Sequence, residues 1–101
     1  MSKRRKSGCS LIPSAFWYRR RKYVVEYVPR KELERGNWGD FSPTSQEIRI
    51  REDLSTTSQR ITELHEVLHI VCDYLSQKYP NFLLTHENLD RIAVELERIL
   101  L

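Results

Sequence analysis

The chain is poor in the residues that build disulfide-stabilised or membrane-spanning proteins. Its 101 residues include two cysteines, three glycines and one methionine, and no apolar run approaches the roughly 20 residues that a membrane-spanning helix needs. Cys9 and Cys72 cannot form a disulfide framework. Residues 7–15, which follow the basic N-terminus, are too polar to be the apolar core of a signal peptide. These absences predict one small cytoplasmic domain without membrane contact.

Charge is distributed unevenly along the chain. Residues 1–31 contain ten lysines and arginines and one acid, a net charge of +9, whereas residues 32–101 have a net charge of −6. A basic segment of this kind is typical of a solvated tail, of a tail docked on an acidic domain, or of contact with nucleic acid. We therefore predict a flexible arm over residues 1–22, with nucleic acid as a candidate partner of residues 3–22, and a folded domain over residues 23–101.

Two segments have the composition of β-strands. Residues 23–28 are β-branched and aromatic and end at Pro29, and residues 46–51 alternate polar and apolar side chains. The charged side chains of the second segment suit a strand at the edge of a sheet. Residues 36–40 have turn chemistry, and residues 16–18 are a candidate third strand.

Two helices are predicted after these strands. Thr56 and Gln59 have the spacing of a capping box, which predicts a helix from about Thr56 to about Lys78. This helix is apolar on two sides, so we expect it to lie between the sheet and a second helix. Thr85 is a favourable N-cap for that second helix, which continues to the end of the chain. The predicted fold is α+β, with a short antiparallel sheet packed on the first helix.

The most informative segment is HEVLH, at residues 65–69. Residues four apart on a helix lie about 40° apart around its axis, so His65 and His69 project from one face and can share a metal ion. Glu66 lies about 100° further round, where its carboxylate can reach a metal-bound water. The pattern predicts one zinc ion held by His65 and His69, with Glu66 as the general base on a zinc-bound water.

A catalytic zinc site needs a third protein ligand. His86 is the remaining histidine, and its place on the second predicted helix borders the apolar face of that helix. Glu87 is the alternative third ligand because carboxylates also bind zinc, but Glu87 points away from the apolar face. Helical geometry therefore favours His86.

Two acids are candidates to orient the ligating histidines. Asp90 lies one turn after His86, and a carboxylate there can accept the second N–H of a ligating histidine or pair with a surface arginine. Asp73, one turn after His69, is the second candidate for this role. Cys72 lies at the boundary of an apolar stripe, which is more typical of a core residue than of a ligand.

Three stretches resemble the small zincin metallopeptidases, particularly compact gluzincin-like proteins of phages and mobile elements. They are SQEIRIRED (residues 45–53), TELHEVLHIVCDY (residues 62–74) and LLTHENLDRIAVELERIL (residues 83–100). In gluzincins a glutamate ligand stands at the position matching His86, and an Asp or Asn stands four residues later, at the position matching Asp90. The histidine at position 86 departs from that pattern. The resemblance implies a zincin-like domain with an edge strand that binds an extended peptide, here formed by Glu47, Ile48, Arg49, Ile50 and Arg51.

The leading hypothesis is a zinc metalloendopeptidase that acts on proteins or peptides in the cytoplasm of a bacterial or phage-infected cell. The alternative is a nucleic-acid-binding protein that uses the basic aromatic segment FWYRRRKY, residues 16–23, beside a non-catalytic zinc site. A third hypothesis is a structural zinc domain whose site is closed by a fourth ligand such as Glu87 or Cys72.

Overall fold

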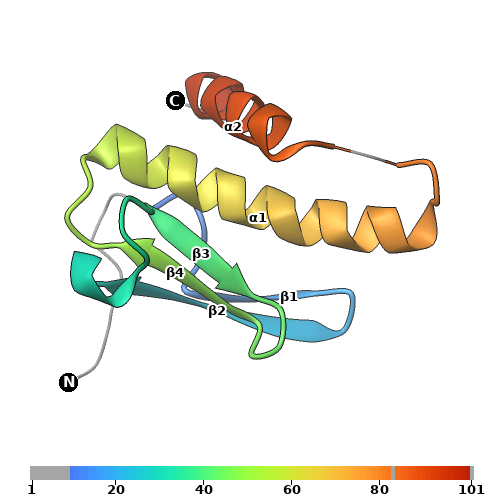
Figure 1. The fold of residues 1–101 in the computed structure, drawn as a ribbon, viewed down its shortest axis with the longest axis horizontal. Coiled ribbons are helices and arrows are strands. Elements are labelled where there is room, and N and C mark those ends of the chain that lie inside the picture. Colours follow the sequence, from blue (N-terminus) through green and yellow to red (C-terminus); the bar gives the residue numbers. More distant parts are fainter. Residues whose placement is uncertain (1–9, 83, 101) are drawn as a thin grey trace.

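The computed structural model describes residues 10–82 and 84–100 as one α+β domain, which confirms the predicted fold class (Figure 1). In chain order the elements are β1 (Ala15–Tyr18), β2 (Arg21–Val28), the short 3₁₀ helix η1 (Arg30–Glu32), β3 (Gly39–Ser42), β4 (Glu47–Arg51), α1 (Thr56–Lys78) and α2 (His86–Leu100). None of the described helices is sufficiently long and apolar to cross a membrane.

The four strands form one mixed sheet in the order β1-β2-β4-β3. The β1–β2 and β3–β4 pairs are antiparallel, whereas β2 and β4 run parallel, with Val25 opposite Ile48 and Tyr27 opposite Ile50. The parallel pairing means that the sheet is not the purely antiparallel one expected. The parallel pairing arises because β3, the strand that follows β2 in the chain, takes the position beyond β4. The chain runs back along β3 before β4 begins, so β4 has the same direction as β2.

Strand β4 is internal to the sheet, so its predicted position at an edge is wrong. Residues Glu47–Arg51 pair with β2 on one side, and all but the last of them pair with β3 on the other. The charged side chains of β4 mark the solvent-facing surface of the sheet instead of its edge; Arg49, for example, donates two hydrogen bonds to Asp40 at 2.6 and 3.0 Å. Because its backbone groups are already paired, β4 cannot bind a peptide by strand addition.

The folded domain begins earlier than residue 23, so the predicted domain boundary is also wrong. Residues 16–18 form part of β1, as their composition suggested, and Ala15 pairs with Val24 of β2. Residues 15–22 therefore belong to a β-hairpin of the sheet. The rest of the predicted arm includes residues 1–9, which lie outside the described residues.

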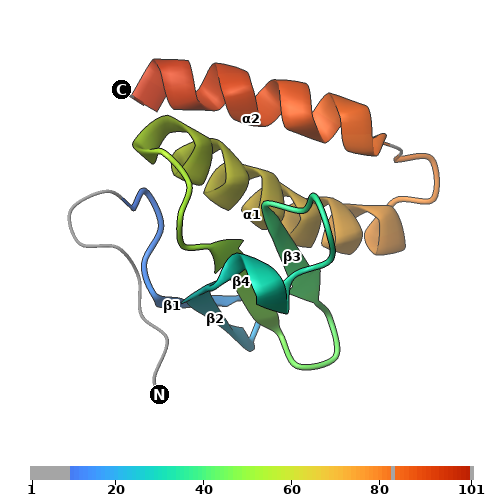
Figure 2. The same cartoon turned by 60° about the vertical axis from the view of Figure 1, so that its left-hand side comes forward.

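Helix α1 lies between the sheet and α2, as the two apolar sides of its sequence predicted (Figures 1 and 2). One face of the sheet supplies the core because side chains alternate along each strand. Buried residues of this core are Tyr23, Val25, Tyr27, Ile48, Ile50, Leu54 and Ile70. On the other side of α1, Leu89 and Ala93 of α2 are buried.

The N-terminal caps of the helices differ in how well the sequence predicted them. Thr85 caps α2 as expected, because its Oγ1 accepts a hydrogen bond from Asn88 N at 3.1 Å. Helix α1 begins at Thr56, but its cap is Ser55, whose Oγ accepts from Ser58 N at 3.2 Å. Gln59 is fully buried and does not complete the expected capping box.

Gln59 instead belongs to a buried polar network centred on Glu63. The Glu63 carboxylate accepts hydrogen bonds from Tyr27 Oη at 2.5 Å, Gln59 Nε2 at 2.9 Å and Leu11 N at 2.8 Å. The network therefore ties β2 and the segment before β1 to the sheet-facing side of α1. Three donors satisfy a carboxylate that is completely removed from solvent.

Replacing Glu63 with alanine is expected to lower the free energy of unfolding by about 3 kcal/mol or more, since it removes the acceptor of three hydrogen bonds and opens a cavity. Tyr27→Phe removes one donor and is expected to cost about 1.5 kcal/mol. Urea titration of both variants measures these losses. A loss below about 1 kcal/mol for Glu63→Ala would show that the network contributes little to stability.

Candidate metal centre

Three histidines converge between α1 and the beginning of α2. His65 and His69 project from the same side of α1, and their Nε2 atoms lie 3.0 Å apart. His86, the first residue of α2, completes a group in which one ring nitrogen of each histidine lies within 4.8 Å of the others. The structure thus brings together the three residues predicted as metal ligands.

Packing of α2 on α1 determines where His86 lies. Thr85 fixes the first turn of α2, and the buried apolar residues Leu89 and Ala93 lie three and seven residues after His86. His86 shares their side of the helix because residues three and four apart are neighbours on a helical surface. Glu87, the alternative ligand, is directed to solvent and contacts Arg91 at 3.5 Å.

The spacing of the three rings suits a tetrahedral metal ion. The ring centroid of His65 lies 4.6 Å from that of His69 and 4.5 Å from that of His86. The centroids of His69 and His86 are 5.1 Å apart. Two nitrogens bound to one zinc ion at 2.0–2.1 Å are about 3.3 Å apart in a tetrahedral site. The 3.0 Å separation of the two Nε2 atoms therefore needs to open by only a few tenths of an ångström.

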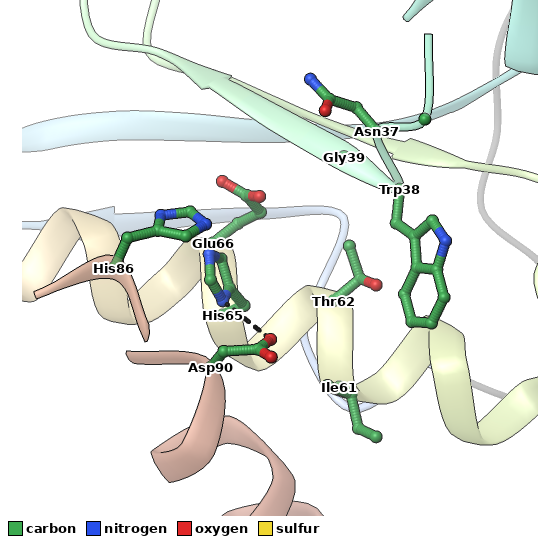
Figure 3. A pocket seen from close by; sticks show the side chains of 10 residues that line it. Asn37, Trp38, Gly39, Ile61, Thr62, His65, Glu66, His86 and Asp90 are labelled. Carbon is green, nitrogen blue, oxygen red and sulfur yellow. Dashed lines mark ion pairs between the residues drawn. The ribbon is translucent and has the colours of Figure 1, made fainter. Parts of the chain in front are cut away.

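Asp90 lies beside the outer nitrogen of His65, and its orienting role stays a prediction. Its Oδ1 is 3.5 Å from His65 Nδ1, a buried atom without a hydrogen-bond partner among the described residues (Figure 3). With Nδ1 directed to Asp90, Nε2 is left to face the other histidines. Asp73, the second candidate, accepts a hydrogen bond from Gln77 Nε2 at 3.3 Å and lies on the exposed surface of α1.

Burial lowers the pKa values of His65 and His69 and so favours the neutral imidazole. The pKa of His65 is lowered first by burial and then by the charge of His86, although Asp90 opposes this shift. Burial and the two neighbouring histidines lower the pKa of His69 to about 4. Both rings are therefore neutral at pH 7, which is the form that binds metals. Burial also raises the pKa of the Cys72 thiol, and Cys72 is not a member of the three-histidine group.

Glu66 occupies the wall of a pocket next to the histidines. Its side chain is 6% exposed, and His65, His86 and Asp90 line the same pocket (Figure 3). Burial, followed by the charge of Asp40, raises the pKa of Glu66 to about 7. A carboxyl group with this pKa can accept and return a proton near neutral pH.

The segment leading into β3 forms the opposite wall of this pocket. This wall is formed by Asn37, Trp38 and Gly39 (Figure 3). Trp38 is 45% exposed. Gly39 permits this close approach of β3 to α1: a Cβ there would lie 2.8 Å from Arg49 O and 2.9 Å from Thr62 Cγ2. Sequence reasoning assigned these residues to a turn and missed their place in the site. The only signal was a tryptophan within otherwise polar turn chemistry.

The arrangement can hold one metal ion with a buried carboxylate beside it. Comparisons of the chain with protein-family models, with curated proteins and with solved structures found no match. The resemblance to small zincins therefore stays a prediction.

Proposed function

We propose that this protein is a zinc-dependent metallopeptidase. The observation that carries the proposal is the placement of Glu66 beside the His65–His69–His86 group. Glu66 and His86 line two pockets, one of which is also lined by His65 and the other by His69. A metal site and a carboxylate that does not bind the metal are the two parts that metal-assisted hydrolysis requires.

The donor set favours zinc over harder cations. Three imidazoles form a ligand set that zinc commonly has in catalytic sites, whereas magnesium and calcium prefer oxygen ligands. When bound, zinc would polarise the scissile carbonyl and acidify a water molecule. His65, His69 and His86 would hold the ion, and Asp90 would hold the ring of His65 in the tautomer that leaves Nε2 free to bind.

Glu66 would move the proton. Its carboxylate would take a proton from the attacking water and deliver it to the nitrogen of the leaving amine, so that one residue acts as base and then as acid. The burial of Glu66 favours this role because a carboxylate shielded from bulk water keeps the proton within the site.

Strand β3 would position the substrate in place of β4. Strand β3 is the edge strand that follows β4 in the sheet order. Its residues Gly39 and Asp40 line a pocket that Glu66 also lines. An extended peptide could pair with this edge by strand addition, as the resemblance implies for a zincin. Trp38 would provide an apolar surface for one substrate side chain.

A structural zinc site is less well supported. The metal-binding group among the described residues contains three histidines and neither Cys72 nor Glu87. A three-ligand group leaves one coordination position open, which is characteristic of catalytic sites.

Removal and restoration of zinc test the proposal. The purified chain is expected to bind about one zinc ion and to cleave members of a mixture of unstructured peptides, detected by mass spectrometry. Treatment with a chelator should abolish cleavage, and equimolar zinc should restore it. Cleavage that persists in the zinc-free protein, or an intact peptide mixture after incubation with the zinc-bound protein, would contradict the proposed activity.

A further inference from the structure

The hairpin formed by β1 and β2 has features that the proposed peptidase site does not use. It lies at the edge of the sheet opposite β3 and carries four consecutive cations, Arg19, Arg20, Arg21 and Lys22 (Figure 1). Two strands, β2 and β4, separate β1 from the strand beside the histidines. A ligand on the outer part of this hairpin would therefore bind away from the metal centre.

The two residues at the tip of the hairpin have left-handed backbone conformations. Arg19 has φ 53° and Arg20 has φ 68°, as in the tight turns that favour Asn-Gly. The Arg19 guanidinium lies 4.2 Å from the ring centroid of Tyr74 on α1, so Arg19 fixes the hairpin to the helix. Arg20 is exposed, and no contact among the described residues explains a charged side chain in this conformation.

The outer face of the hairpin presents an aromatic side chain beside a cation. Trp17 is 69% exposed, the highest value for any aromatic side chain among the described residues, and it pairs directly with Lys22 across the strands. Their side chains share the face of the sheet that is turned away from α1, because the neighbouring positions Tyr18 and Tyr23 face the helix.

The exposed cations of the hairpin form no ion pair with the described part of the chain. Within residues 10–82 and 84–100, neither Arg20 nor Lys22 forms an ion pair, whereas five other arginines do. The paired residues are Arg30, Arg49, Arg51, Arg91 and Arg98. The hairpin therefore combines unpaired positive charge with an exposed indole ring, while residues 32–101 are acidic.

We propose that the tip and outer face of the β1–β2 hairpin bind single-stranded nucleic acid. Phosphate groups would contact Arg20 and Lys22, and an unpaired base would stack on Trp17. A base within a duplex is already stacked on its neighbours, so the exposed indole favours a single strand. A single tryptophan and the half-exposed Val24 offer too little apolar surface for stable membrane insertion. This inference does not depend on the proposed peptidase activity.

Fluorescence anisotropy with the full chain and a labelled single-stranded DNA of about 12 nucleotides tests the proposal. Trp17→Ala is expected to weaken binding about tenfold or more through loss of stacking. Lys22→Gln should weaken binding and reduce the slope of log affinity against log salt by about 0.7. Matched controls are Trp38→Phe, at the other tryptophan, and Lys31→Gln, which removes one charge beyond the far end of β2. Both controls should bind like the wild type.

The Trp38→Phe variant also gives a direct readout, since Trp17 is then the only tryptophan in the chain. Its fluorescence should be quenched when the DNA binds. The proposal is overturned if this fluorescence does not change, or if Trp17→Ala and Lys22→Gln bind as tightly as their controls. Binding to vesicles that contain anionic lipid, in the absence of DNA binding, would also overturn it and identify a membrane surface as the ligand.

Discussion

Glu66→Gln is expected to keep zinc bound and to lose peptide hydrolysis by a factor of about 10²–10⁴. The amide has nearly the same shape as the carboxylate but cannot accept a proton from the attacking water. Zinc should stay bound because Glu66 is not a member of the three-histidine group. Initial rates of peptide cleavage, together with zinc content determined on the same preparations, measure both effects.

Glu87→Gln is the matched control for this substitution. Glu87 is next to His86 in sequence, but its side chain is 76% exposed, so its amide variant should retain full activity and full zinc content. A Glu66→Gln variant that retains activity within about twofold of the wild type would contradict the assignment of Glu66 as the general base.

His86→Ala is expected to weaken zinc binding by a factor of about 100 or more, because the site retains only two of its three imidazole ligands. Glu87→Ala should leave zinc affinity unchanged, since the side chain of Glu87 is directed to solvent on the other side of α2. Competition with a chromophoric chelator measures both affinities, and circular dichroism shows whether each variant remains folded.

The two possible results identify the third ligand. Loss of affinity in His86→Ala alone would agree with the convergence of the three rings in the structure. Unchanged affinity in His86→Ala, with loss in Glu87→Ala, would mean that α2 must rotate on binding zinc to present the Glu87 carboxylate to the metal.

Local helical geometry explains the sequence predictions that hold. The relation of His65, His69 and Glu66 depends only on the 3.6-residue period of α1, and the start of α2 depends on the Thr85 hydroxyl and the Asn88 amide three residues apart. Such relations extend over fewer than five residues, so a sequence pattern contains all the information that they require.

Relations between strands were harder to predict. The alternation of polar and apolar side chains along Glu47–Arg51 indicates which side chains face the core. It does not indicate which strands pair with the backbone of this segment. Strand β3 was missed because four residues that include Gly39 and Asp40 have low strand propensity. They form a strand through pairing with β4 and packing against α1, which are contacts made at a distance in the sequence.

The sequence by itself determined the helices, the alternation of the buried strands and the two histidines that share one face of α1. The tertiary structure decided the sheet order, placed β3 and Trp38 opposite Glu66, and turned residues 15–22 into a hairpin of the domain. The physical reason is the range of the interactions. Helix periodicity and capping act between neighbouring residues, whereas strand order and the walls of a pocket result from packing that brings distant segments together.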